Sequence, residues 1–296
     1  MSKIAIMTDS NSGIMPTEGK EAEIHVLPMP ILVDGQTYYE GQDITPAQFY
    51  QKLSEGISVT TSQPSPGELI QMWDRLLGSY DEIVFIPMSS GLSNSCQTAS
   101  VLSQEEPYNG KVHVVDNHRI SITQEQSVYD AKSLAEEGAS GKEIKTLLEA
   151  ESLDASIYIA VDTLEYLKKG GRITAAAAAI GTVLNLKPVL TIQGNKLDAC
   201  SKTRGMKAAF KTMCKAVQKD LDTRFADLKK DGLLQVGIAT TLMDEEKLTY
   251  FKEEMQQHFP DMKLQSAPLT MSIGCHTGPG AVGIGIFRTH IPFSTG

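Results

Sequence analysis

Two clusters of hydroxyl side chains are the residues best suited to chemistry in this sequence. They occupy Thr60–Ser65 and Ser89–Ser95. The second cluster follows a predicted strand, Ile83–Pro87, and precedes a predicted helix, so it lies at the carboxyl end of a strand, where open α/β sheets bind ligands. Free N–H groups and a partial positive charge at a helix start favour an anion. The pattern therefore predicts a site for a carboxylate or a phosphate, although turn and cap chemistry is the alternative for the first cluster.

One histidine out of six stands in a glycine-rich segment, Gly274–Gly280, which we expect to form a loop before the last strand. Glycine allows backbone to approach a ligand closely, so His276 is a candidate binding residue and the other five are expected to be structural. The same segment matches GxGxxG from Gly278 to Gly283. A dinucleotide site needs a strand before that motif and a helix after it, and here a strand follows. We therefore expect no nucleotide cofactor.

A third candidate segment combines a flexible turn, a guanidinium group and a run of small residues. It reads Gly170-Gly171-Arg172-Ile173-Thr174 and continues with Ala175–Ala179. Arginine can bind a carboxylate or phosphate through two parallel hydrogen bonds. The alanine run either packs closely as a good helix former or leaves a slot open. Arg204 adds positive charge further along the chain, where most such residues only contact solvent.

Composition excludes several classes of function. The 296 residues carry a formal net charge of -9, which disfavours nucleic-acid binding because that binding depends on clustered Lys and Arg. The apolar stretch 173–192 is interrupted by Asn185, Lys187 and Pro188, so we expect no membrane span. The four cysteines form no CxxC pair. We therefore expect no metal site and no disulfide framework, which fits a reducing cytoplasm.

The first half of the chain is predicted to form a largely parallel sheet flanked by helices. Strands are expected at Lys3–Met7, Ile83–Pro87 and Val112–Val115, and helical signals alternate with them. Helices should begin after Thr45, Ser65 and Ser140, because each of these residues starts a capping box and the first two are followed by proline.

The second half is predicted to be another α/β unit. Its expected elements are a strand at Ile157–Val161, a hairpin of Pro188–Ile192 and Leu197–Ser201, a helix from Met206, a strand at Leu234–Thr240, a helix at Glu245–His258 and a strand at Ala281–Phe287. The fold class is therefore α/β with two domains, which we assign to residues 1–158 and 159–296.

Taken together, six motifs resemble those of the DegV family in order and spacing over nearly the whole chain. They are Thr8-Asp9-Ser10, Thr61-Ser62-Gln63-Pro64-Ser65, Ser89-Ser90-Gly91-Leu92-Ser93, Gly170-Gly171-Arg172-Ile173, Lys187-Pro188 and His276-Thr277-Gly278-Pro279-Gly280. The resemblance implies a DegV-like fold of two α/β domains with a fatty acid between them. The family includes FakB-like fatty-acid-binding proteins, the carriers of the bacterial fatty acid kinase system. The resemblance also implies two partners, a long-chain fatty acid and a separate fatty acid kinase, and at most transient contact with a membrane. It implies that the chain itself performs no catalysis and binds no cofactor.

The resemblance also assigns roles to individual residues. Thr61, Ser62 and Ser93 are expected to hold the fatty acid carboxyl group, with His276 nearby from the second domain. Contact with a phosphate or a partner is expected for Arg172, Arg204 and Gly278.

A serine hydrolase is the alternative function. It would use Ser93 and His276, with Asp9 or Asp116 to orient the histidine. No GxSxG motif surrounds Ser93, and the sequence does not show a base aligned on it. The carrier remains the favoured prediction.

Overall fold

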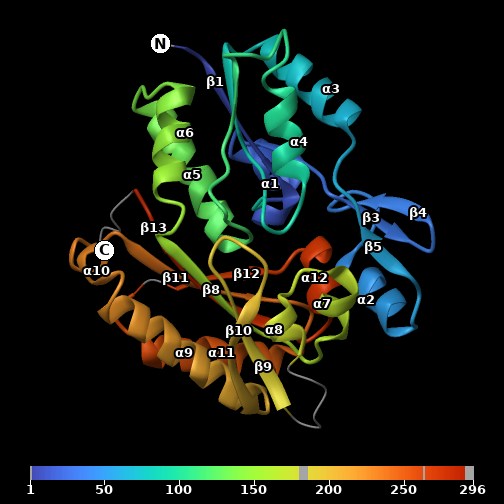
Figure 1. Cartoon of the computed structure of the whole chain (residues 1–296), viewed down its shortest axis with the longest axis vertical. Coiled ribbons are helices and arrows are strands. Elements are labelled where there is room, and N and C mark those ends of the chain that lie inside the picture. Colours follow the sequence, from blue (N-terminus) through green and yellow to red (C-terminus); the bar gives the residue numbers. More distant parts are fainter. Residues whose placement is uncertain (1, 180–185, 263, 291–296) are drawn as a thin grey trace.

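The computed structural model describes residues 2–179, 186–262 and 264–290 and shows two α/β layers, one above the other (Figure 1). The upper layer is built on a four-stranded parallel sheet, as predicted. The strands in spatial order are β2 (His25–Leu27), β1 (Ile4–Asp9), β6 (Glu82–Ile86) and β7 (Val112–Val114). Because all four run parallel, their carboxyl ends meet at the edge that faces the lower layer (Figure 1).

Helices cover both faces of this parallel sheet. One face packs against α3 (Pro66–Leu77) and α4 (Ser95–Leu102), and the other against α5 (Ile122–Glu136) and α6 (Gly141–Ala150). A short helix, α1 (Pro16–Glu21), and a single 3-10 turn, η1 (Ser10–Ser12), complete this part.

The predicted helix starts are confirmed. Each cap residue accepts a hydrogen bond from the backbone N–H three residues later, and the side chain at that later position accepts the backbone N–H of the cap residue. The cap residues are Thr45, Ser65 and Ser140. The first of these residues precedes α2 (Pro46–Ser54). Capping boxes could be predicted because all their partners lie within four residues of one another.

A small antiparallel sheet beside the parallel one was not predicted. It consists of β4 (Gln36–Tyr39), β3 (Pro30–Val33) and β5 (Val59–Thr61), and α2 packs against it. Asp34 and Gly35 connect β3 to β4 with positive φ angles of 51° and 78°. An Asp-Gly pair at a hairpin turn is a recognised sequence signal for this arrangement.

The lower layer is a mixed six-stranded sheet. Its strands in spatial order are β10 (Asp198–Arg204), β9 (Leu186–Ile192), β8 (Ala155–Ala160), β13 (Val282–Arg288), β11 (Leu234–Thr240) and β12 (Leu264–Pro268). Among the described residues of this sheet, β11 and β12 are the only strands that pair in parallel. The helices of this half are α7 (Glu165–Gly170), α8 (Ala175–Ala178), α9 (Met206–Asp222), α10 (Ala226–Lys230), α11 (Glu245–His258) and α12 (Met271–Thr277).

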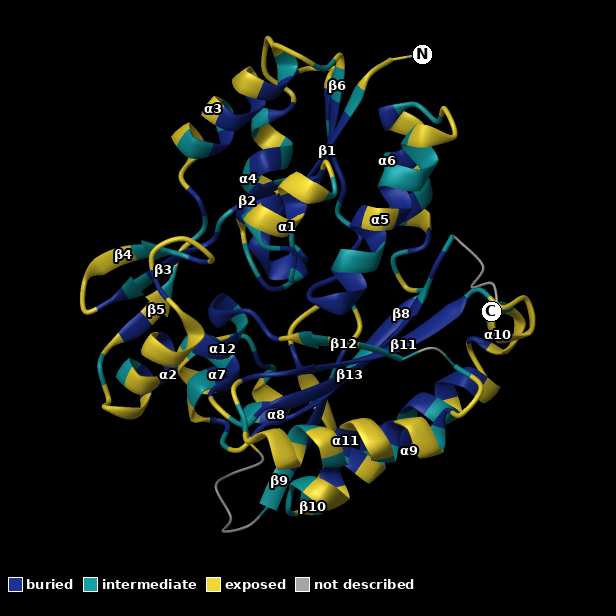
Figure 2. Cartoon of the chain, turned by 180° about the vertical axis from the view of Figure 1, so that it is seen from behind, coloured by how far each residue is buried: buried dark blue, intermediate teal, exposed yellow. Residues whose placement is uncertain are grey.

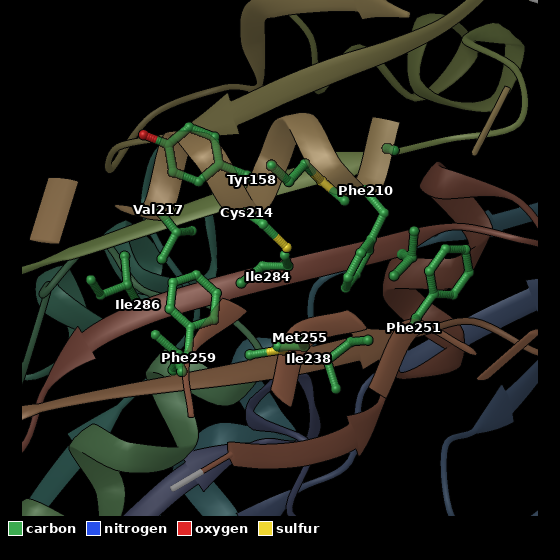
Figure 3. Close-up of a cluster of buried hydrophobic side chains, with 14 of the residues drawn as sticks. Tyr158, Phe210, Cys214, Val217, Ile238, Phe251, Met255, Phe259, Ile284 and Ile286 are labelled. Atoms are coloured by element: carbon green, nitrogen blue, oxygen red, sulfur yellow. The ribbon is translucent and has the colours of Figure 1, made fainter. Parts of the chain in front are cut away.

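One face of this sheet packs against α9 and α11, and the other turns toward the upper layer (Figure 1). Phe210 and Phe251 from the helices meet Ile238 and Ile284 from the strands in a continuous hydrophobic core (Figure 3). The central strands β8, β11 and β13 are buried along most of their length (Figure 2). The sheet therefore has one face filled by its own helices and one face available to the interface between the layers.

The predicted domain boundary between residues 158 and 159 falls within β8. This strand pairs with β13 and β9 of the lower sheet, whereas α6 before it packs on the upper sheet. We infer that the division lies in the turn between these two elements, residues 151–154.

Across the residues that the structure describes, no helix combines the length and the apolar character needed to cross a bilayer.

Candidate functional site

A cavity of about 370 Å³ lies between the two layers, and its walls are mostly apolar. Its floor is the upper face of the lower sheet, where Ile159, Gly283 and Ala239 stand side by side on three neighbouring strands. Met88, Leu92 and other apolar side chains of the upper layer close it from above. The volume falls within the range of about 300–1,000 Å³ that is usual for pockets holding small molecules.

Glycines on β13 create the open space of the floor. Side chains alternate along a strand, and here Ile284 points into the helix-covered core while Gly283 and Gly285 line the cavity. A methyl group at Gly285 would come within 2.9 Å of Ile122 Cδ1, so the first residue of α5 can pack directly on the sheet only because no side chain is there. A methyl group at Gly283 would meet no atom closer than 3.4 Å, so it would project into the cavity.

The predicted hydroxyl groups converge at a polar part of the same cavity. Thr61, Ser62, Ser93 and His276 all line it. Thr61 Oγ1 and His276 Nε2 lie 2.9 Å apart and share a hydrogen bond between the upper and lower layers. Ser93 Oγ lies 2.9 Å from the hydroxyl oxygen of Ser95 and accepts the backbone N–H of that residue at 3.2 Å.

His276 lies in a helix and not in the predicted loop. It occupies the last turn of α12, and Gly278 then ends the helix with a φ of 75°. Three glycines in the seven residues 274–280 favoured the loop prediction, but Gly274 is present because a side chain there would overlap the Tyr50 hydroxyl group. Tertiary packing therefore overrides the local helix propensity.

The imidazole of His276 is neutral at physiological pH. Burial lowers its pKa to about 4, and the nearby Arg172 guanidinium contributes in the same direction. A neutral imidazole offers one N–H donor and one acceptor nitrogen. It can therefore hydrogen-bond a polar group in the cavity and Thr61 without bringing a second positive charge to the site.

Arg172 lines the cavity, and its contacts link the two layers. Its Nε donates to the Leu92 carbonyl at 3.3 Å, next to Ser93, and its Nη1 donates to the Gly170 carbonyl. A side chain at Gly170 would overlap the His276 ring. The turn at residues 170–172 thus fixes both a cation and the histidine.

Two predicted residues lie elsewhere. Arg204 ends β10 at the surface, and Gly278 packs against Tyr166; neither is among the residues that line the cavity. Only glycine suits position 278, because its φ is positive and a side chain would overlap the tyrosine ring.

The arrangement required for the hydrolase alternative is not formed among the described residues. No hydrogen bond joins Ser93 to His276, since these residues bond to Ser95 and Thr61. Asp9 is buried and accepts the Asn11 and Met88 backbone N–H groups at 3.0 and 2.8 Å.

The second acid proposed for that alternative is also engaged elsewhere. Asp116 lies 3.5 Å from His118 Nδ1 and accepts the Ser90 backbone N–H at 3.3 Å. Neither carboxylate therefore orients His276.

Sequence reasoning missed a polar wall of the cavity formed by Asn11, Ser121 and Ser272. These residues come from three separate segments, and single polar residues of this kind carry no local pattern. The glycines of β13 were detectable, because the alternation Gly-Ile-Gly-Ile marks a strand with one bare face.

Two α/β layers stack around an apolar cavity whose wall carries hydroxyl groups and an imidazole, an arrangement with the shape and polarity to suit a small amphipathic molecule. The sequence profile described as "Uncharacterised protein, DegV family" matches residues 3–289. The chain belongs to the DegV family.

Relatives of known structure share the whole fold. A DegV family protein from Thermus thermophilus, described for its fatty acid binding, is 32% identical with a TM-score of 0.85 over 97% of this chain and 99% of its own. The fatty acid binding DegV family protein from Streptococcus agalactiae is 27% identical with a TM-score of 0.86 over 98% and 100% of the two chains. A DegV domain-containing protein from Deinococcus radiodurans is 31% identical over 285 residues, 96% of this chain and 98% of the relative. The predicted family and fold class are therefore confirmed.

Proposed function

We propose that the chain binds one long-chain fatty acid in the cavity and acts as a cytoplasmic carrier that presents it to a separate fatty acid kinase. The observation that carries the proposal is a cavity with an apolar floor and a wall of hydroxyl groups at Thr61, Ser62 and Ser93. An acyl chain fits the apolar floor, and a carboxyl group fits the wall of hydroxyl groups. Fatty acid binding by the relatives from Thermus thermophilus and Streptococcus agalactiae supports the same assignment.

Burial of the acyl chain would supply most of the affinity. About fifteen methylenes at ~0.8 kcal/mol each give roughly 12 kcal/mol before the costs of association. Each hydrogen bond to the charged head group adds about 1.5–3 kcal/mol. The polar residues therefore select a ligand with a carboxyl group and fix the orientation of that ligand in the cavity. Burial of the acyl chain on the apolar floor supplies most of the binding free energy.

The neutral His276 can favour carboxylate binding through Thr61, the residue to which it is hydrogen-bonded. If the imidazole donates its Nε2 proton to Thr61 Oγ1, the threonine hydroxyl proton is free to donate to the ligand. Ser93 can donate in the same way, because its oxygen already accepts a backbone N–H. Arg172 supplies the positive charge that balances the carboxylate.

Phosphorylation would be the task of the partner. We expect the protein loaded with radiolabelled palmitate to yield an acyl phosphate, trapped as a hydroxamate, when ATP, Mg²⁺ and a bacterial fatty acid kinase are added. Free palmitate at the same concentration, without the carrier, should give far less product. Equal product with and without the carrier would contradict the presentation step.

The binding step is tested by mass spectrometry of an organic extract of the purified protein. We expect close to one fatty acid per chain, either as isolated or after incubation with palmitate. No stoichiometric fatty acid under either condition would count against the proposal.

Ser93→Ala should weaken palmitate binding by about tenfold to a hundredfold, because it removes one hydrogen bond to a charged group. Isothermal titration measures the change. Ser90→Ala, a substitution of the same size outside the cavity lining, should leave the affinity unchanged. Equal affinities for the wild type and the Ser93 variant would exclude Ser93 as an anchor.

Gly170→Ala should also weaken binding, by about tenfold, since the added methyl group overlaps the His276 ring and displaces it from Thr61. The matched control is Gly67→Ala at the start of α3, where a methyl group has room. Retained affinity in the Gly170 variant would show that the position of the imidazole does not matter for binding.

A further inference from the structure

Helix α12 lies between β12 and β13 of the lower sheet in the sequence, but several of its side chains contact elements of the upper layer. Met271 and Cys275 pack into the core between the small antiparallel sheet and α2. The Cys275 thiol donates to the Val59 carbonyl at 3.5 Å, and His276 bonds to Thr61 two residues further along β5. The position of this helix relative to the upper layer therefore decides where the imidazole lies.

A buried carboxyl group from the upper layer binds the first residues of this helix. Glu40, which follows β4, is 1% exposed. It accepts the backbone N–H of Met271 and the hydroxyl group of Ser272, the latter at 3.3 Å. It also accepts the Ser10 hydroxyl group at 3.0 Å. Within the part of the chain that the structure describes, the donors to this carboxyl thus come from the start of α12 and from η1.

The same network reaches the cavity wall. The Ser272 hydroxyl oxygen also lies within hydrogen-bond distance of the side-chain oxygen of Asn11, an alternative acceptor for its single proton, and both residues line the cavity. Ser10 in turn accepts the backbone N–H of Met29, a third lining residue, at 3.0 Å. Glu40 therefore contacts Ser272 of the polar wall without lining the cavity itself.

We propose that Glu40 is a positioning residue: it fixes the start of α12 and thereby holds His276 in place for the fatty acid carboxylate. This inference rests on the proposed function. Met271 and His276 are five positions apart, about 7.5 Å along a helix, so a shift at the first residue is carried to the imidazole.

Close packing leaves the helix little freedom to absorb such a shift. A side chain at Gly274 would overlap the Tyr50 hydroxyl group, so the backbone of α12 already rests against α2. Tyr50 is also a titratable neighbour of Glu40: burial raises the pKa of the Tyr50 hydroxyl group, and the Glu40 charge acts in the same direction. Burial raises the pKa of Glu40 to about 7, while its hydrogen bonds act in the opposite direction. A buried carboxyl without those donors would destabilise the fold, so the contacts with α12 are needed to keep it there.

The test compares Glu40→Gln with the wild type for two ligands of equal chain length, palmitate and hexadecanol. Glutamine has the same shape but replaces one acceptor oxygen with an NH2 group, so it cannot accept from every present donor. Palmitate affinity should fall about tenfold, the effect of one weakened hydrogen bond to a charged group. Hexadecanol affinity should change less than about twofold, because it lacks the carboxylate.

Glu125→Gln is the matched control. Glu125 is another largely buried carboxyl whose pKa burial raises to about 7; it accepts the Gln265 side-chain amide of β12 at 2.6 Å, and no hydrogen bond joins it to α12 among the described residues. Its variant should bind palmitate with wild-type affinity. Amide exchange should rise in residues 271–277 of the Glu40 variant and not of this control.

A double-mutant cycle separates positioning from a general structural effect. In a His276→Ala background, Glu40→Gln should cost less than about twofold in palmitate affinity, because the group it positions is gone. Additive losses, or an equal loss for palmitate and hexadecanol, would overturn the inference and leave the proposed function standing. Absence of palmitate binding by the wild type would instead overturn the proposed function and this inference with it. If Glu40→Gln does not fold, Ser10→Ala removes one hydrogen bond to Glu40 at a residue outside the cavity lining and supports the same comparison.

Discussion

Gly283→Val is expected to weaken fatty acid binding strongly while leaving the protein folded. A methyl group at this position meets no atom closer than 3.4 Å and projects into the cavity, so the larger valine side chain occupies the floor where the acyl chain would lie. Excluding about three methylenes from burial, at ~0.8 kcal/mol each, corresponds to roughly a 60-fold loss of affinity. Isothermal titration with palmitate measures it.

The thermal midpoint of Gly283→Val should stay at or above that of the wild type. Valine is favoured over glycine in a strand interior, because glycine loses more conformational freedom on folding. Gly283→Ala provides a graded comparison, since one methyl group should cause a smaller loss. Wild-type palmitate affinity in the valine variant would mean that the ligand does not lie over β13.

Ile284→Ala, one residue further along the same strand, should have the opposite effect. The side chain of Ile284 is fully buried among Phe210, Cys214 and Met255 on the helix-covered face (Figure 3). Truncating a buried isoleucine to alanine typically costs about 2–5 kcal/mol, from lost burial and the cavity left behind.

Chemical denaturation measures the stability change, and titration at low temperature measures binding by the folded fraction. Palmitate affinity per folded molecule should stay within about twofold of the wild type. A large loss of affinity with unchanged stability would show that the two faces of β13 have been assigned the wrong way round.

Much of the fold could be predicted because its signals are local. The capping boxes at Thr45, Ser65 and Ser140 involve residues within one helical turn, and β11 and α11 have the bounds that their hydrophobic patterns predict. The small antiparallel sheet was missed because β5 pairs with β3 across about 30 residues and both strands are short. Its Asp34-Gly35 turn was the available signal.

The candidate site was predictable only in part. Hydroxyl groups at strand ends are visible as clusters, so Thr61 and Ser93 could be found, and the structure brings both to one cavity. Glu40 could not be found, because its partners at Ser10 and Met271 are brought together only by the tertiary fold. Arg204 lies at the surface outside the cavity lining, so its contact with a phosphate or a partner stays a prediction.

A crystal structure of the protein grown with palmitate tests the account most directly. We expect acyl-chain density along the floor formed by Ile159, Gly283 and Ala239, with the carboxylate within hydrogen-bond distance of Thr61 and Ser93. A cavity filled by ordered water under saturating palmitate, or a fatty acid bound elsewhere on the protein, would contradict it.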